Sequence, residues 1–134
     1  MYPKDPVARA KVDFLLCWEA GTLYPAMADA IYPVIGFKPP TDQLEANKKV
    51  FAEKLQFLND HLITEPYMTG PDMTIADVST AVSLTMPTII DDKPFVKYPK
   101  ISSWLARMQA EELYKQVDAP FQETKAAMQE QMKK

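Results

Sequence analysis

The chain has 134 residues, of which 47% are apolar and 25% are charged, as is typical of one globular domain. Its net charge is −3 and it has no basic cluster beyond Lys133 and Lys134, so we expect no nucleic-acid partner. No run approaches the ~20 apolar residues that span a bilayer, so we expect no membrane partner. The three glycines are too few for a fold of tight β-turns, and the twelve prolines should mark helix boundaries.

Cysteine and histidine occur once each, as Cys17 and His61. A structural zinc site needs about four ligands, so we expect no metal. A single cysteine excludes an internal disulfide, which suits a reducing compartment. Residues 1–6 lack the apolar stretch of a signal peptide, and we therefore expect a cytoplasmic protein.

The first predicted helix runs from residue 7 to about 31. Asp5 is a plausible N-cap, and Pro6 suits the first helical position. Pro25 removes a backbone donor and should bend or split this long helix. We expect the helix to end by Pro33.

The second predicted helix begins at residue 41 or 42 and ends at 61. The third covers residues 74 to about 88, and Asp77 is its only charge between residues 75 and 86. A helix that is apolar on nearly every side should be central and buried. Further helical segments are expected over residues 99–109 and 111–117, and after Pro120 as an exposed tail. Since no segment alternates with a period of two, the predicted fold class is all-α, with five to six helices.

The sharpest local signal is a capping box at the start of the third helix. Thr74 can accept a hydrogen bond from the Asp77 amide, while the Asp77 carboxylate reaches back to the Thr74 amide. Met73 and Val78 are spaced to form the accompanying hydrophobic staple. We interpret Asp77 as a structural cap, not a catalytic acid. On this basis Thr74→Ala should cost about 1 to 2 kcal/mol, and Asp77→Asn less.

Residues 70–77, of sequence GPDMTIAD, resemble the capping segment of the C-terminal domain of cytosolic glutathione transferases. Residues 2–6, YPKDP, and 21–24, GTLY, are similar to the linker and first C-domain helix of the insect delta and epsilon classes. Residues 97–101, KYPKI, with Trp104, resemble the next family segment. The resemblance covers nearly the whole chain except the polar segment after residue 118.

The resemblance implies an all-helical domain over residues 1–134 that belongs to a glutathione-conjugating, detoxifying enzyme. Family members carry a preceding thioredoxin-like domain, which holds the Ser or Tyr that activates the glutathione thiol. This chain begins at about the linker, so we expect it to lack that domain and to catalyse no conjugation alone. Glutathione is then a co-substrate only when the preceding domain is present, and no cofactor binds the chain by itself.

In the family the first C-domain helix lines the pocket for the hydrophobic co-substrate. By position, five residues are candidates for that wall, with Tyr24 the strongest and Glu19 the least suited to an apolar pocket. They are Leu16, Trp18, Glu19, Tyr24 and Met27. Because five residues here span both faces of a helix, some should be core or dimer contacts instead.

Three other groups of residues could react or bind an ion, and for each we favour an interpretation without such a role. Cys17 could be a reactive thiol but is expected to be a small buried hydrophobe. His61 beside Asp60 suggests an acid/base pair, but neighbouring residues of a helix point in different directions. A histidine at the C-terminal end of a helix is more simply explained by its favourable interaction with the helix dipole. Asp91 and Asp92 could bind a cation but are expected in an exposed loop.

Two functions compete. The first is half of an enzyme, in which this domain binds small hydrophobic molecules and forms a homodimer through its first two helices. The alternative is a stand-alone, non-catalytic binding or protein-interaction module. In either case an apolar face that packs on a thioredoxin-like domain in the family would be available to that domain or to another protein partner.

Overall fold

A computed structural model describes residues 1–64 and 66–134 and confirms the all-α fold class. The described part of the chain forms five helices, as expected, and holds one isolated bridge between Tyr67 and Gly70 in place of any strand. None of the described helices is long and apolar enough to span a bilayer.

The first helix is 30 residues long and has three parts. They are α1 (Pro6–Trp18), a π-helical turn η1 (Glu19–Leu23) and α2 (Tyr24–Ile35). Asp5 is the N-cap, as predicted, because its carboxylate accepts from the Ala8 amide at 2.9 Å.

The expectation that Pro33 ends this helix is wrong, because α2 continues to Ile35. A proline inside a helix leaves the carbonyl four residues earlier without its amide donor. Here that carbonyl belongs to Asp29, and it accepts from the Asn47 side chain of the neighbouring helix at 3.4 Å. The helix ends instead at Gly36, whose φ of 85° suits glycine.

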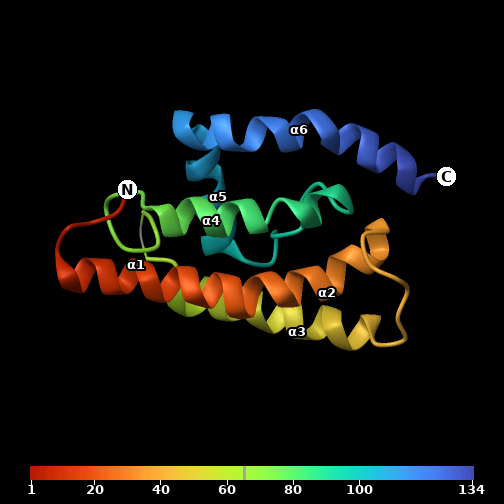
Figure 1. Ribbon diagram of the computed structural model, residues 1–134, viewed down its shortest axis with the longest axis horizontal. Helices are drawn as coiled ribbons and strands as arrows, with labels where there is room; N and C mark the ends of the chain where they lie inside the picture. Colours follow the sequence, from red (N-terminus) through yellow and green to blue (C-terminus); the bar gives the residue numbers. More distant parts are fainter. Residues whose placement is uncertain (65) are drawn as a thin grey trace.

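The second helix comprises α3 (Leu44–Phe57) and a π-helical turn η2 (Leu58–Leu62). It begins two to three residues later than predicted, because Thr41 accepts from the Gln43 amide in a local turn. Helices α2 and α3 pack side by side, and together with α1 they form one layer of the molecule (Figure 1).

Helix α4 (Ile75–Ser83) lies between this layer and the C-terminal helix (Figure 1). It is shorter than predicted, since Leu84 and Thr85 break it and Met86–Ile89 forms a separate 3₁₀ turn, η3. Its central position agrees with its apolar sequence, although Val82 is 40% exposed. The core around it includes the fully buried Trp104 and Met108.

Helix α5 (Pro99–Ala110) matches its predicted bounds closely. The expected break at Pro120 is wrong, because one helix, α6 (Glu112–Met132), runs through it. At an exposed position the carbonyl freed by a proline can be satisfied by water, so the helix tolerates it. Tyr114 is the buried residue of α6, and most of the helix is exposed, as expected for the polar tail.

Candidate functional site

The π-helical turn η1 divides the first helix at the candidate wall. The Tyr24 amide donates to the Glu19 carbonyl, five residues earlier. The extra residue in this turn makes room for the ring of Pro25, which cannot continue a regular hydrogen-bond ladder. Within this turn Glu19 is buried, whereas Tyr24, five residues later, is exposed. Such turns are frequent at functional sites.

Glu19 is only 7% exposed and lies against α4. Its Oε2 accepts from the Ser79 hydroxyl at 3.0 Å, and its Oε1 accepts from the Ser83 hydroxyl. The two serines lie one turn apart on the same face of α4, so their hydroxyls meet one carboxylate. This Glu19 cluster holds η1 against the central helix and gives a buried polar side chain its hydrogen-bond partners.

Tyr24 begins an exposed aromatic row that also contains Tyr32 and Phe37. The Tyr24 and Tyr32 hydroxyls lie 2.8 Å apart, and their rings meet edge to face with centroids 6.2 Å apart. The Phe37 ring follows at 5.5 Å from Tyr32. Phe37 reaches this position because Gly36 turns the chain, and the Phe37 amide donates to the Tyr32 carbonyl at 2.9 Å.

The two phenols of the aromatic row are coupled electrostatically. Partial burial of Tyr32, followed by its hydrogen bond to Tyr24, raises the pKa of Tyr32 to about 12. The Tyr32 hydroxyl is therefore protonated at neutral pH, and either hydroxyl of the pair could be the donor. Tyr24 and Phe37 remain 41% and 53% exposed, so the row offers an apolar surface with two polar tips.

The other predicted wall residues have different surroundings. Met27 is fully buried in the core, and Leu16 is partly buried against it. Trp18 packs toward α3, with its ring 6.0 Å from that of Phe57. The structure therefore brings Tyr24, but not the other four candidates, into the exposed aromatic row.

The capping box predicted from the sequence is present at the start of α4. The Asp77 Oδ2 accepts from the Thr74 amide at 2.9 Å, and the Thr74 hydroxyl accepts from the Ala76 amide at 3.3 Å. The Asp77 Oδ1 accepts at 2.8 Å from both the Met68 amide and the Trp104 indole. These last two partners are distant in sequence, and the local motif does not predict them.

The remaining candidates have mixed outcomes. The interpretation of Cys17 as buried is wrong, because it lies on the exposed side of α1. His61 lies in η2 with its ring 5.0 Å from Phe57, whereas Asp60 accepts from Asn59 and Gln56. These two bonds lower the pKa of the Asp60 carboxyl.

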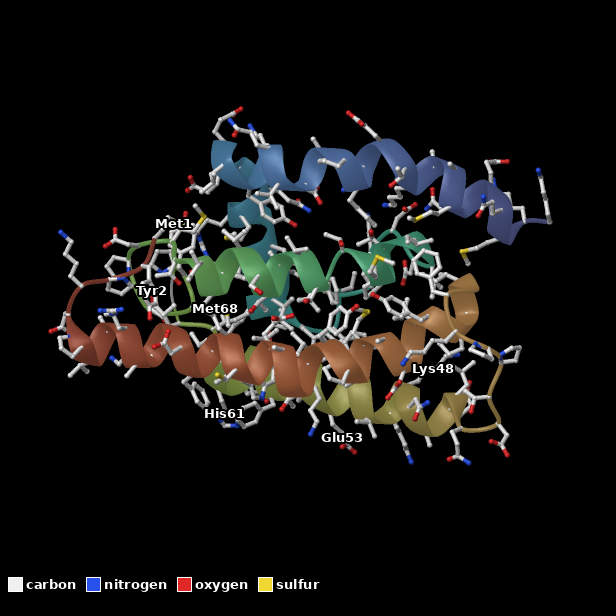
Figure 2. All side chains as sticks on the ribbon, in the orientation of Figure 1. Met1, Tyr2, Lys48, Glu53, His61 and Met68 are labelled. Atoms are coloured by element: carbon white, nitrogen blue, oxygen red, sulfur yellow. The ribbon has the colours of Figure 1, made fainter. Side chains whose placement is uncertain are left out.

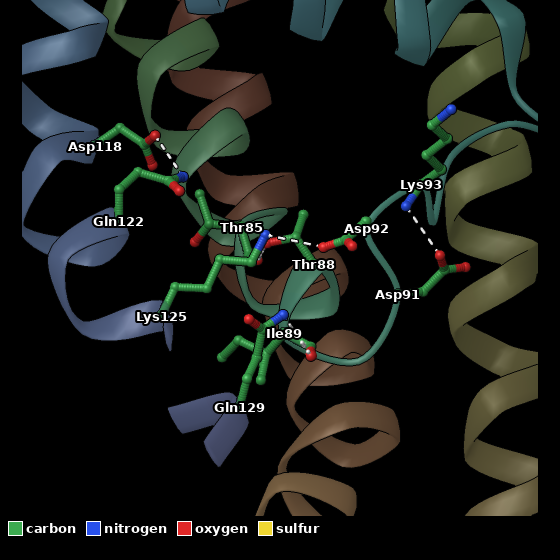
Figure 3. A network of polar contacts seen from close by, with 10 residues as sticks. All are labelled: Thr85, Thr88, Ile89, Asp91, Asp92, Lys93, Asp118, Gln122, Lys125 and Gln129. Atoms are coloured by element: carbon green, nitrogen blue, oxygen red, sulfur yellow. Dashed lines mark hydrogen bonds and ion pairs between the residues drawn. The ribbon is translucent and has the colours of Figure 1, made fainter. Parts of the chain in front are cut away.

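Asp91 and Asp92 lie in an exposed loop, as expected (Figure 3). Asp91 accepts from the Lys93 amide at 2.9 Å, and Asp92 pairs with Lys125 of α6 at 3.5 Å. Within the described residues no group of three or more His, Cys, Asp or Glu side chains could hold a metal ion.

Sequence reasoning missed Tyr32, Phe37, Ser79 and Ser83. Tyr32 stands eight residues after Tyr24, close to two helical turns, so the pair could have been found from spacing. Phe37 follows a glycine at a helix end, where the chain commonly folds back. The serines give no such signal, because their partner Glu19 is 60 and 64 residues away.

Two further regions of the surface bear on function. Met1 lies beside the start of α4 (Figure 2), and its carbonyl accepts from the Ile75 amide at 3.1 Å. On the outer side of the α1–α3 layer, Phe14 and Phe57 are 56% and 42% exposed. Val50 on α3 is also 42% exposed, so this layer carries a run of large apolar side chains.

The fold and these features define an all-helical domain with an exposed aromatic surface at a π-helical turn. Residues 22–112 match the family described as "Glutathione S-transferase, C-terminal domain". This match covers more than half of the chain, which therefore belongs to that family.

Known relatives agree with this assignment. The chain is 36% identical over 126 residues to glutathione S-transferase 1 of Manduca sexta, covering 90% of this chain and 55% of that protein. A delta-class glutathione transferase of Nilaparvata lugens superposes with a TM-score of 0.81 at 33% identity, and the match covers 98% of this chain and 61% of that chain. A human theta-class transferase, solved with the glutathione conjugate of 1-menaphthyl sulfate, superposes with a TM-score of 0.75 at 25% identity. That match covers 98% of this chain and 55% of the human chain. The chain thus spans little more than half the length of these relatives.

Proposed function

We propose that this chain forms the electrophile-binding wall of a glutathione-conjugating enzyme in detoxification and does not itself activate the glutathione thiol. Membership of the transferase family supports the first part. The aromatic row carries the proposal, because Tyr24 and Phe37 offer exposed rings beside two hydroxyl groups. Such a surface suits aromatic electrophiles, which stack on rings and accept a hydrogen bond at a polar substituent.

A relative supports the class of co-substrate. The human theta-class structure contains the glutathione conjugate of 1-menaphthyl sulfate, an aromatic compound. By analogy we propose that Tyr24 contacts the aromatic part of the electrophile, with Tyr32 and Phe37 extending the wall. Leu16, Trp18, Glu19 and Met27 then shape the wall from behind or from its edges, since they are partly or fully buried.

Thiol activation requires a group that this chain is not expected to supply. A free cysteine thiol has a pKa near 8.5, and lowering it needs a donor or positive charge held against the sulfur. Tyr32 is a poor candidate, because its hydroxyl is committed to Tyr24 and its pKa is raised. In the family the activating residue lies in a thioredoxin-like domain, which we propose adjoins Met1 and the start of α4.

We also propose that the chain forms a homodimer through the exposed α1–α3 layer. Phe14, Val50 and Phe57 give this layer large apolar side chains that a partner copy would cover. Cys17 is exposed on α1 and forms no disulfide, which suits the reducing cytoplasm that we expect for this protein.

The alternative function is a stand-alone binding module. The exposed apolar side chains of the α1–α3 layer are the observation that favours this alternative, because a different protein could cover them.

A binding measurement tests the wall. The fluorescence of 1-anilinonaphthalene-8-sulfonate reports an apolar aromatic probe binding to the 134-residue chain. Tyr24→Ala should weaken binding roughly fivefold or more because it removes a stacking ring. Tyr24→Phe, which keeps the ring, serves as the control and should bind within about twofold of the parent. Unchanged binding by Tyr24→Ala would contradict the proposed wall.

A further inference from the structure

A second apolar groove lies away from the aromatic row, between α2, α3 and the loop that follows η3. Its volume is about 510 Å³, in the range of small-molecule sites. The groove floor contains Phe51, Leu55 and Phe95, which are 5 to 7% exposed. None of the five predicted wall residues lines it. The groove is therefore a feature separate from the proposed electrophile wall.

The floor of this groove is continuous with the core of the domain. Ala30 and Ile31 reach it from α2 and are 0% and 9% exposed. At the mouth, Ile90 and Val96 are 43% and 71% exposed. A ligand that covered the mouth would bury this apolar surface, which is favourable in proportion to the area removed from water.

The rim of the groove is positively charged. It carries Lys48, Lys93 and Lys97, with Asp91 as its single carboxylate. Lys48, labelled in Figure 2, is paired with Glu45 at 3.2 Å. Figure 3 shows Asp91 and Lys93 on one loop, where the Asp91 carboxylate accepts from the Lys93 amide.

The ammonium groups of Lys93 and Lys97 are the available charges. Within the described part of the chain, neither makes a hydrogen bond or an ion pair through its side chain. Two unpaired cations beside an apolar floor suit a ligand with an anionic head and a long apolar body. A small hydrated anion would leave the floor uncovered, and a neutral lipid would leave the lysines without a partner.

We infer that this groove binds the anion of a free long-chain fatty acid. The acyl chain lies along Phe51, Leu55 and Phe95, and the carboxylate lies at the rim between Lys93 and Lys97. Binding in this mode depends on chain length, since each further buried CH₂ should strengthen it about fourfold. It also depends on the charge of the head group and weakens with salt, because the lysines are exposed.

Calorimetric titration of the 134-residue chain with dodecanoate, below its micelle concentration, tests the inference. The double variant Lys93→Glu/Lys97→Glu should bind at least about tenfold more weakly, since it replaces attraction by repulsion. Lys49→Glu/Lys134→Glu makes the same change in net charge at two exposed lysines outside the groove. This control should bind within about twofold of the parent.

Ala52→Trp tests the acyl chain. Ala52 is exposed and lines the groove, so an indole there should fill the hollow without disturbing the core. Dodecanoate binding should fall about tenfold, while circular dichroism shows an unchanged fold. Dodecyltrimethylammonium should bind more weakly than dodecanoate, and decanoate about fifteenfold more weakly than dodecanoate.

Three outcomes would overturn the inference. They are unchanged binding in the Lys93→Glu/Lys97→Glu variant, unchanged binding in Ala52→Trp, and equal binding of the ammonium amphiphile. Tyr24→Ala separates this site from the electrophile wall, because it should leave dodecanoate binding within about twofold. A large loss of dodecanoate binding in Tyr24→Ala, with no loss in Ala52→Trp, would show that the acyl chain binds at the aromatic row instead of the groove.

Discussion

Asp77 illustrates how a single side chain can serve more contacts than its sequence motif indicates. Its two oxygens accept hydrogen bonds from the Thr74 and Met68 amides, the Thr74 hydroxyl and the Trp104 indole. The residue is fully buried, so each donor would lose a partner that water cannot replace. Asp77 thus joins the start of α4 to the preceding loop and to α5.

These contacts reverse the order of mutational costs that the capping motif alone suggests. Thr74→Ala should lower the free energy of unfolding by about 1 kcal/mol. Asp77→Asn should lower it by about 3 kcal/mol, because an amide has one acceptor oxygen and would turn N–H groups toward existing donors. Urea denaturation of both variants measures the difference. A smaller loss in Asp77→Asn than in Thr74→Ala would contradict the assigned contacts.

The phenol pair gives a second prediction for a single residue. The pKa of Tyr32 is raised from 10.0 to about 12, so the folded state binds its proton more tightly than the unfolded state. The stability from this effect is fully present below pH 10 and is lost as the pH rises toward about 12. The free energy of unfolding of the parent should therefore fall more steeply in this window than that of Tyr32→Phe.

Absorbance of the tyrosinate ion at alkaline pH provides the direct readout. The difference between the titrations of the parent and Tyr32→Phe isolates Tyr32. In Tyr24→Phe the pKa of Tyr32 should move down toward its ordinary value, since the hydrogen bond is lost while partial burial remains. An ordinary pKa for Tyr32 in the parent would show that the two hydroxyls do not interact as described.

At the scale of the elements, caps supplied by distant residues matter as much as local ones. Helix α5 begins at Pro99, and its N-cap residue Tyr98 provides no side-chain cap. The Asn59 side chain of η2 instead accepts from the Lys100 and Ile101 amides at 2.9 and 3.2 Å. The end of the second helix therefore stabilises the start of α5, across about 40 residues of sequence.

Asn59→Ala should lower the free energy of unfolding by about 1 to 2 kcal/mol, because two amides at a helix start lose their acceptor. Asn59→Asp keeps an acceptor for the two amides at the positive end of the helix, but it loses the amide donor to Asp60 and places two carboxylates side by side, so it should recover only part of the stability. Asn47→Ala removes a longer, more exposed bond and serves as the control. Equal losses in Asn59→Ala and Asn47→Ala in thermal denaturation would contradict the assigned cap.

How far each element could be predicted depends on where its partners lie. Asp5 and the Thr74–Asp77 box were predicted because a cap and its amides are within three residues. The prediction that Pro33 ends its helix is wrong because the Asn47 side chain that compensates for the proline lies on another helix. The prediction that Cys17 is buried is wrong because periodicity identifies a helix face but not what covers it. The role of Tyr24 in the wall stays a prediction, and its partner Tyr32 was overlooked.

At the scale of the whole molecule, the α1–α3 layer should be a dimer interface. Sedimentation of the parent at high concentration should give about twice the chain mass of 15.2 kDa. Phe14→Glu/Phe57→Glu should shift the chain toward monomer, because it places charges in an apolar contact. Val117→Glu, at an exposed apolar residue of α6, is the matched control and should leave the mass unchanged. A monomeric parent would contradict the proposal.

We propose that this chain supplies the electrophile wall while a separate domain activates glutathione. To test this, the part of the Nilaparvata lugens transferase that this chain does not cover is joined to Met1, and conjugation of 1-chloro-2,4-dinitrobenzene is measured. The 134-residue chain alone should match the uncatalysed rate, and the joined protein should be active. In the joined protein Tyr24→Ala should raise the KM for the electrophile about fivefold and leave the KM for glutathione within about twofold. Clear turnover by the chain alone, or a Tyr24→Ala effect confined to glutathione, would contradict the account.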